Sequence, residues 1–303
     1  MGERRFFRMV NRVVSMTSAW KGETGLVAGT RLVVAVSGLW FVLLVTRNLG
    51  PVGRGEITIA FSLAWGAVIV GDLGVVTACR LRLLAGVGAA DRGVHALAAG
   101  SMLGVQGALA GLGAVLFGLT GTDLGASVVV ATVGLAVSIG AMRAASELGY
   151  GVRGYRWVSF VELGVAAGQV VASTGLWTVG RLSTTTAVIA MAIPHLVGAV
   201  VMGRRLGFVP SRIGTRVPFR SLATDGLSSM LGSAAHYLAV RSNRLVVAGV
   251  LGARSAGEFA VAVTLPETLR LVPRAISQVL GDRLRSGETT LRDVRRPLIL
   301  VIL

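Results

Sequence analysis

The chain has one cysteine and few acidic residues, and the low number of each argues against certain classes of site. Its single cysteine, Cys79, has no partner for a disulfide within the chain, and no Cys/His cluster has metal-ligand spacing. Acidic residues number 14 against 30 Lys and Arg, and no Asp-x-Asp or His/Glu metal pattern occurs. The longest loop expected between apolar segments has about 20 residues, too few to hold a sugar-transfer site. We therefore expect no metal, no cofactor and no enzymatic activity.

Hydrophobic residues, by contrast, are abundant and form long runs. They make up 53% of the chain, and the mean hydropathy is +0.74. The charges are gathered in short clusters between apolar runs of about 20 residues, which is typical of a multi-pass membrane protein. A net charge of +16 would suggest nucleic-acid binding in a soluble protein. Because the arginines lie between apolar runs, we expect no nucleic-acid partner.

The apolar runs predict an all-α bundle of eight full membrane helices and the start of a ninth. A helix needs about 20 apolar residues to cross the hydrocarbon core of a bilayer. The runs that meet this length are 27–46, 57–78, 94–119, 125–142, 157–179, 184–203, 222–248 and 256–280. The ninth run, 297–303, has seven residues, so we expect the chain to end inside a membrane helix.

The basic residues predict the orientation. Counted between the expected helices, 21 fall on one side, Arg143 among them, and four on the other, namely Arg47, Arg54, Arg181 and Arg254. The positive-inside rule then places the N-terminus and the even-numbered loops in the cytoplasm. We expect the basic N-terminal segment 1–24 to lie as an amphipathic helix against anionic lipid headgroups.

One sequence element occurs twice. The stretch LGPVGRGEITIA at 49–60 is matched, 202 positions later, by LGARSAGEFAVA at 251–262. The matched positions include Leu49, Gly50, Gly55 and Glu56 in the first copy and Leu251, Gly252, Gly257 and Glu258 in the second. Six expected helices separate the copies, and an even number returns the chain to the same side of the membrane. The repeat therefore predicts two parallel lobes related by an axis along the membrane normal.

These lobes define the expected domain organisation. The basic segment 1–24 precedes a six-helix N-terminal lobe at 25–205. A cytoplasmic linker at 206–221 leads to a partial C-terminal lobe at 222–303, with two full helices and the start of a third.

Several charged residues fall inside the expected helices. An arginine near the bilayer centre costs about 2.5–3.5 kcal/mol on the insertion scale, so we expect these side chains to face a cavity or one another. The residues concerned are Arg31, Arg241, Arg244, Arg270, Arg274, Asp72, Glu162 and Glu267. The spacing of Ser233, Tyr237, Arg241 and Arg244 places them on one stripe of the seventh helix.

Each of these residues also has a structural interpretation. Arg241 and Arg244, and likewise Arg274, are long enough to extend toward the membrane surface. Glu267 and Arg270 are spaced for a structural ion pair. His195 is a candidate proton carrier, although a single histidine in a helix bundle is more often packed and hydrogen-bonded.

Three motifs resemble those of a known family. They are TRNLGPVGRG at 46–55, GDLG at 71–74 and VLGARSAGEF at 250–259. Together they are similar to polysaccharide flippases of the multidrug/oligosaccharidyl-lipid/polysaccharide exporter superfamily. The resemblance implies two six-helix lobes around a central cavity and export of undecaprenyl-diphosphate-linked oligosaccharide by alternating access across the bacterial cytoplasmic membrane, for cell-surface polysaccharide synthesis.

The resemblance also implies roles for residues and partners. Cationic residues of the cavity would receive the diphosphate, and the candidates are Arg31, Arg241, Arg244 and Arg270. Candidates for gating or ion coupling are Asp72, Glu162, Glu267 and His195. A polysaccharide polymerase and glycosyltransferases are the protein partners it implies.

Two departures from the family pattern keep alternatives open. The seventh helix reads RSNR at 241–244, where relatives often have an acidic residue before the arginine, and most of the second lobe is missing. A drug/cation antiporter of the same superfamily is the nearest alternative, but it should contain more acidic than basic residues in its cavity. The remaining alternatives are a membrane scaffold without transport activity and an inactive fragment of a flippase.

Overall fold

A computed structural model describes residues 23–86, 92–120, 124–207 and 219–269. The described residues form seven α-helices and no strand. In chain order they are α2 (Glu23–Gly71), α3 (Val75–Leu84), α4 (Arg92–Gly118), α5 (Ala126–Gly151), α6 (Tyr155–Thr178), α7 (Thr184–Arg205) and α8 (Phe219–Leu269). The expected all-α class is confirmed.

Six of these helices are long and apolar enough to cross a membrane: α2, α4, α5, α6, α7 and α8. The chain is therefore a multi-pass membrane protein by helix length and hydropathy. The expected segment 1–24, the linker 206–221 and the ninth run 297–303 lie wholly or mostly outside the described residues, as does the end of the eighth run.

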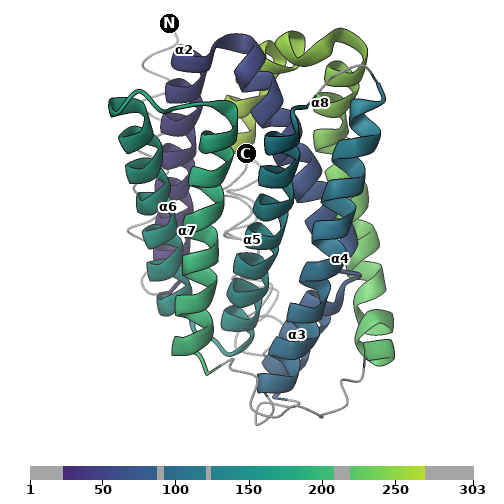
Figure 1. The fold of residues 1–303 in the computed structure, drawn as a ribbon. Helices are drawn as coiled ribbons and strands as arrows, with labels where there is room; N and C mark the ends of the chain where they lie inside the picture. The colour runs from purple at the N-terminus through teal and green to yellow at the C-terminus, as the bar shows by residue number, and fades with distance from the viewer. Residues whose placement is uncertain (1–22, 87–91, 121–123, 208–218, 270–303) are drawn as a thin grey trace, which may run out of the picture.

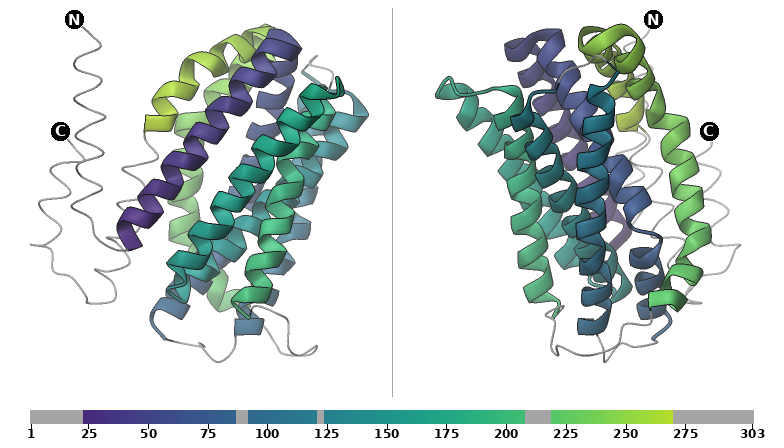
Figure 2. Two further views of the ribbon diagram at one scale, coloured as in Figure 1. Left: turned by 90° about the vertical axis from the view of Figure 1, so that its left-hand side faces the viewer. Right: turned by 45° about the vertical axis from the view of Figure 1, so that its right-hand side comes forward.

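Helices α2 and α8 are each two helices joined at a kink. A continuous 49-residue helix would be about 73 Å long, far more than the roughly 30 Å hydrocarbon core. The backbone leaves the helical conformation at Gly50 in α2 and at Gly252 in α8. Figures 1 and 2 show that α2 and α8 both reverse direction at the upper end of the bundle. The first expected span and most of the second thus lie in α2, and the seventh and the described part of the eighth lie in α8.

The kink in α2 has a clear chemical cause. Pro51 has no backbone N–H and disfavours helical geometry in the residue before it. That residue is Gly50, with φ 67° and ψ −172°, a region that essentially only glycine adopts. At the second kink Ala253 stands where Pro51 stands in the first, and Gly252 alone takes the corresponding conformation, φ 81° and ψ 175°.

The second expected span, 57–78, is interrupted near its end. Helix α2 ends at Gly71 and α3 begins at Val75, with positive φ at Leu73 (48°) and Gly74 (76°). The Oδ1 atom of Asp72 accepts a hydrogen bond from the backbone N–H of Val76 at 3.0 Å and so stabilises the first turn of α3. The GDLG motif at 71–74 is therefore a turn between two helices.

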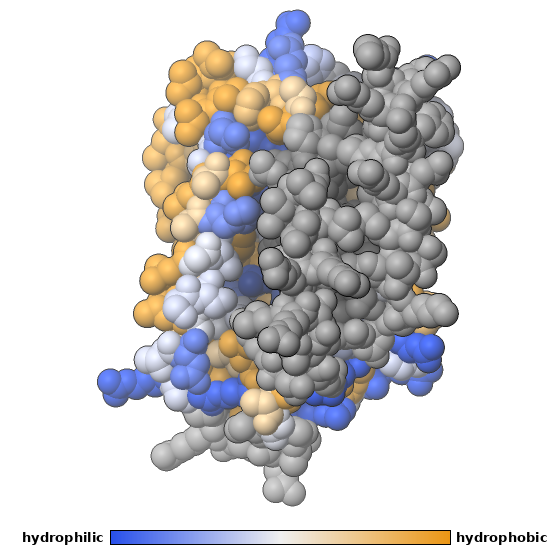
Figure 3. Space-filling view, turned by 180° about the vertical axis from the view of Figure 1, so that it is seen from behind, coloured by the Kyte–Doolittle hydropathy of each residue, from blue (hydrophilic) through white to orange (hydrophobic). Residues whose placement is uncertain are grey.

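The bundle packs around α5, the most buried of the candidate spans. Figure 1 shows α5 between α6 and α7 on one side and α3 and α4 on the other, and α8 packs along α2. In Figure 3, hydrophobic side chains lie along the left-hand edge of the molecule, and hydrophilic residues gather toward its lower end, with others at the top and in a strip beside the grey atoms. Lipid-facing flanks of this kind are expected for a membrane bundle.

Arginines are unevenly distributed between the two ends of the bundle. The C-terminal ends of α3, α5 and α7 and the N-terminal ends of α4, α6 and α8 lie at the lower end in Figure 1, and both kinks lie at the upper end. Arginines at or beside the lower helix ends include Arg82, Arg92, Arg153, Arg204, Arg205 and Arg220. Those at the upper end that are exposed are Arg47, Arg181 and Arg254. This asymmetry is the basis for the prediction that the lower end is cytoplasmic.

Candidate functional site: charged residues between the membrane helices

The charged residues inside the helices form two clusters. One consists of ion pairs among α2, α3, α5 and α6, and the other of arginines between α2 and α8. The sequence predicted that such residues would face a cavity or one another, and the structure places several of them against one another.

Arg31 belongs to a charge-balanced cluster. Its Nη2 lies 3.1 Å from Oε1 of Glu162 on α6, and it donates a hydrogen bond to the hydroxyl of Tyr150 on α5 at 3.3 Å. From α3, Arg80 lies 2.5 Å from the carboxylate of Glu147 and stacks over the Tyr150 ring, with 5.5 Å to the ring centre. Two arginines thus balance two glutamates. Arg31 would have to exchange Glu162 for a phosphate to act as predicted.

Asp72 has its own arginine. Its Oδ2 atom lies 3.3 Å from Nη2 of Arg143, and Asp72 is 2% exposed. The sequence placed Arg143 in a cytoplasmic loop, but it lies within α5 and its side chain is largely buried. Helix α5 continues nine residues past the apolar run 125–142, as far as Gly151. Its charged residues there have partners: Arg143 pairs with Asp72 in the turn between α2 and α3, and Glu147 pairs with Arg80 on α3.

His195 is held by its own helix. Its Nδ1 atom lies 2.7 Å from the carbonyl oxygen of Met191 and 3.0 Å from the side-chain amide of Gln169 on α6. A carbonyl only accepts, so the bond to Met191 requires a proton on Nδ1. This geometry is that of a packed, hydrogen-bonded histidine, which is the interpretation that the sequence favoured; a proton-carrying role stays a prediction.

A second cluster lies between α2 and α8, near the kinked end. Arg244 is 7% exposed, so it lies inside the described bundle and does not extend to the surface. Tyr237 and Arg241 are its neighbours on α8, and the charges of both arginines act on the Tyr237 hydroxyl, as the predicted stripe implies. That hydroxyl donates to the backbone carbonyl of Ser62 on α2. Arg244 therefore faces the α2–α8 contact.

Three predicted residues are not placed. The side chain of Glu267, at the end of α8, and all of Arg270 and Arg274 lie outside the described residues. The pairing of Glu267 with Arg270, and a role for Arg270 in binding diphosphate, stay predictions.

The two copies of the repeat pack against each other reciprocally. A Cβ atom on Gly55 would lie 1.7 Å from the carbonyl oxygen of Ala253, and one on Gly257 would lie 2.0 Å from that of Pro51. Gly55 corresponds to Gly257 in the repeat, and Pro51 corresponds to Ala253. The contact is thus the same on both sides, as expected for two like segments related by a two-fold axis.

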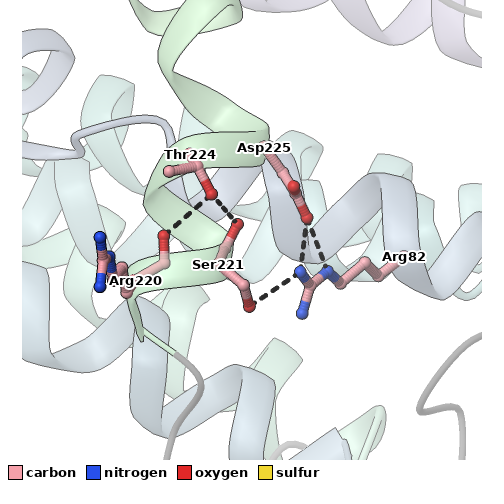
Figure 4. Close-up of polar contacts among 5 residues, drawn as sticks. All are labelled: Arg82, Arg220, Ser221, Thr224 and Asp225. Carbon is pink, nitrogen blue, oxygen red and sulfur yellow. Dashed lines mark hydrogen bonds and ion pairs between the residues drawn. The ribbon is translucent and has the colours of Figure 1, made fainter.

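At the end of the bundle opposite the kinks, an ion pair joins α3 to α8. In Figure 4, Arg82 of α3 reaches the first turns of α8, where two of its nitrogens donate to Oδ2 of Asp225 at 2.5 and 3.1 Å. It also donates to the hydroxyl of Ser221 at 3.0 Å. Close by, the backbones of Gly74 and Gly226 touch, and a Cβ on Gly74 would lie 2.2 Å from the Gly226 carbonyl oxygen.

Sequence reasoning missed Arg54, Arg80, Glu147 and Tyr150. Arg54 was assigned to an outer loop because it falls between the expected helices 27–46 and 57–78, yet it is buried in α2 at 7% exposure. Glu147 and Tyr150 are three residues apart on α5, a spacing that places both on one helix face and was available as a signal.

A groove of about 590 Å³ lies between α5 and α7, and none of its lining residues is charged. It is therefore not a site for a diphosphate. Comparison with known proteins returns no match to the chain, whether among protein-family models, curated proteins or solved structures.

Proposed function

We propose that this chain is a transporter, or part of one, that moves an undecaprenyl-diphosphate-linked oligosaccharide across the bacterial cytoplasmic membrane by alternating access. The observation that carries the proposal is the reciprocal packing of the two repeat copies, Gly55 on Ala253 and Gly257 on Pro51. Transporters built from repeats bind substrate at the repeat interface. The sequence motifs that resemble polysaccharide flippases supply the substrate class.

The charges at the interface suit an anionic headgroup. Arg244 and Arg54 are buried between α2 and α8, and Arg241 lies beside them. Arginine offers a planar set of donors that matches phosphate oxygens, and a low-dielectric site strengthens this contact. In this proposal the two halves of the transporter move about the α2–α8 contact, which is closed at one end by Arg82 and Asp225.

A drug/cation antiporter is the second candidate, because Asp72 and Glu162 are buried acids inside the bundle. Each of them is paired with an arginine, Asp72 with Arg143 and Glu162 with Arg31. A cationic substrate would have to displace an arginine at either site, which makes this function the weaker of the two.

The test is transport by the purified chain in vesicles. A fluorescent undecaprenyl-diphosphate saccharide is placed in one leaflet, and its appearance in the other is followed with a membrane-impermeant quencher. We expect movement by the wild type and at least about tenfold slower movement by Arg244→Gln, a loss of about 1.4 kcal/mol of transition-state stabilisation. The matched control is Arg47→Gln, on the exposed surface of α2.

The alternatives give different results in the same vesicles. Exchange of a cationic dye for protons or sodium, without saccharide movement, would support the antiporter. Movement of neither substrate by the wild type would reject transport by this chain and favour the scaffold or inactive fragment.

A further inference from the structure

Arginines at the lower end of the bundle are not all used in the same way. Two of them join one helix to another. Arg82 of α3 pairs with Asp225 of α8, and Arg92 of α4 donates a hydrogen bond to the backbone carbonyl of Leu206, at the end of α7, at 3.1 Å. The contacts within the protein account for both of these charges.

The adjoining ends of α6 and α7 carry three arginines of another kind. Arg156, Arg204 and Arg205 are exposed. Among the residues that the structure describes, no ion pair includes any of the three. Figure 1 shows α6 and α7 side by side at one edge of the bundle. The charges are therefore presented outward, where a membrane protein meets lipid.

An aromatic pair lies beside these charges. The guanidinium carbon of Arg205 lies 4.7 Å from the centre of the Trp157 ring, and Trp157 packs edge-on against Phe160 with 6.4 Å between the ring centres. The two aromatic residues are 46% and 59% exposed. Tryptophan is enriched where a membrane meets water, because its ring contacts acyl chains near the level of the headgroups. The cluster thus combines an apolar contact with a positive charge, as binding of an anionic lipid requires.

Exposed apolar residues extend along both helices from this cluster. On α7, Val197, Val201 and Arg205 follow one another at intervals of four residues, so they share one helix face. On α6, Val171 lies three turns beyond Phe160 on the same face. The valines are exposed, and both helices are long and apolar enough to cross a membrane. Acyl chains can lie along these faces while the headgroup stays at the arginines.

Stabilisation of the helices explains only part of the cluster. Arg204 and Arg205 lie in the last turn of α7, where the negative end of the helix dipole favours a cation. Arg156 lies in the first turn of α6, where the dipole disfavours a cation, and no acidic residue lies in that turn. Arg156 is therefore unfavourable for α6 itself, and a bound anion would offset this.

We infer that Arg156, Arg204 and Arg205, together with Trp157, bind the headgroup of an anionic phospholipid at the ends of α6 and α7. Guanidinium groups donate hydrogen bonds to the phosphate oxygens, and basic residues beside membrane helices attract anionic lipids. The inference needs only a chain that spans the membrane. It does not rest on the proposed function, and it concerns none of the residues assigned there to the diphosphate.

The experiment measures lipid binding to the purified full chain in neutral detergent by native mass spectrometry. The probe is phosphatidylglycerol, and zwitterionic phosphatidylcholine is the lipid control. The variants are Arg156→Gln, Arg205→Gln and the double variant. Arg220→Gln is the matched control, because it removes an equal charge from an exposed position at the same end, on α8.

We expect wild type and Arg220→Gln to bind phosphatidylglycerol equally, and at least about tenfold more tightly than phosphatidylcholine. Each single variant should bind it about fivefold more weakly, or about 1 kcal/mol, and the double variant at least about tenfold more weakly. An equal loss in Arg220→Gln would show attraction to the overall charge of this end and would overturn the site. Equal affinity of the wild type for the two phospholipids would do the same.

Two further probes test for other occupants. Inorganic phosphate represents a soluble anion, and undecaprenyl diphosphate represents a lipid carrier. Binding of inorganic phosphate as tight as that of phosphatidylglycerol, or tighter binding of undecaprenyl diphosphate, would overturn the assignment to a phospholipid. Weaker binding of both would support it.

A second measurement locates the lipid without changing an arginine. Phosphatidylglycerol with brominated acyl chains quenches the fluorescence of tryptophans that it contacts. We expect Trp157→Phe to remove most of the saturable quenching, and Trp177→Phe, near the opposite end of α6 and 45% exposed, to retain it. Unchanged quenching in Trp157→Phe would contradict the site. So would a large loss of thermal stability in Arg156→Gln, because that result would assign Arg156 to the fold.

Discussion

Gly55 and Ala253, from the two copies of one repeated sequence element, meet backbone to backbone. There is no room for a side chain at Gly55, because a Cβ atom would stand 1.7 Å from the Ala253 carbonyl oxygen. Gly257 meets Pro51 in the same way at 2.0 Å. Small residues that let helix backbones approach closely are a recurrent feature of membrane helix packing.

Substituting either glycine should separate the helices. We expect Gly55→Ala and Gly257→Ala each to destabilise the protein by about 1–3 kcal/mol, since backbone must move to accept the methyl group. Thermal unfolding in detergent measures this. Gly38→Ala, earlier in α2, is the control, because a Cβ there meets nothing within 4 Å. Equal stability of Gly55→Ala and Gly38→Ala would show that the close contact is not required.

The two kinks should depend on glycine to the same extent. Gly50 and Gly252 both have positive φ with extended ψ, where an L-residue costs about 1–3 kcal/mol. We therefore expect Gly50→Ala and Gly252→Ala to lower the unfolding temperature by similar amounts. Gly104→Ala, in open space on α4, should leave it unchanged or raise it slightly. A tolerated Gly252→Ala would mean that the turn in α8 needs no glycine.

Variants of the Arg31–Glu162 ion pair can distinguish a structural role of Arg31 from a role in binding diphosphate. Glu162→Gln should cost about 1–3 kcal/mol, less than for a fully buried pair because the Arg31 side chain is 27% exposed. The double variant Arg31→Gln/Glu162→Gln should recover part of this stability. If Arg31 also binds diphosphate, the double variant remains slow in the saccharide assay. Wild-type rates in a stable double variant would assign Arg31 to structure alone.

Alternating access predicts that the contact between Arg82 and Asp225 opens during transport. In a background with Cys79, the only cysteine of the sequence, replaced by Ser, cysteines at 82 and 225 are joined with a bifunctional thiol reagent that contains a reducible spacer, because the long arginine side chain leaves these backbones too far apart for a direct disulfide. The crosslinked protein should lose saccharide movement and recover it when the spacer is reduced. A second pair of cysteines within one helix, at 156 and 160 of α6, controls for treatment with the reagent. Full transport by the crosslinked protein would mean that this end of the bundle does not open.

The same pair should contribute little to stability. The side chains of Arg82 and Asp225 are 26% and 52% exposed, and partly exposed ion pairs are worth about 0–1 kcal/mol. We expect Asp225→Asn to shift the unfolding temperature only slightly, and Arg82→Gln likewise. A large loss of stability would indicate that the contact holds the fold together and is not made to break.

Much of the fold follows from the order of residues alone. Apolar runs of membrane length predict helices because hydrocarbon offers no partner for backbone polar groups, so the helix must satisfy its own. The repeat at 49–60 and 251–262 predicts two alike segments, and glycine at the matched positions Gly50 and Gly252 permits the positive φ that both residues adopt. These properties are local, so neighbours in sequence determine them.

Which charges meet could only be decided by the tertiary structure. Arg31, Asp72 and Glu162 were recognisable as costly residues in a membrane, but their partners, Glu162 with Arg31 and Arg143 with Asp72, lie more than 70 residues away. The buried position of Arg54 was hidden for the same reason: its environment is formed by α8, almost 200 residues later in the chain. Electrostatic energy depends on distance in space and on burial, and both arise only when distant helices pack.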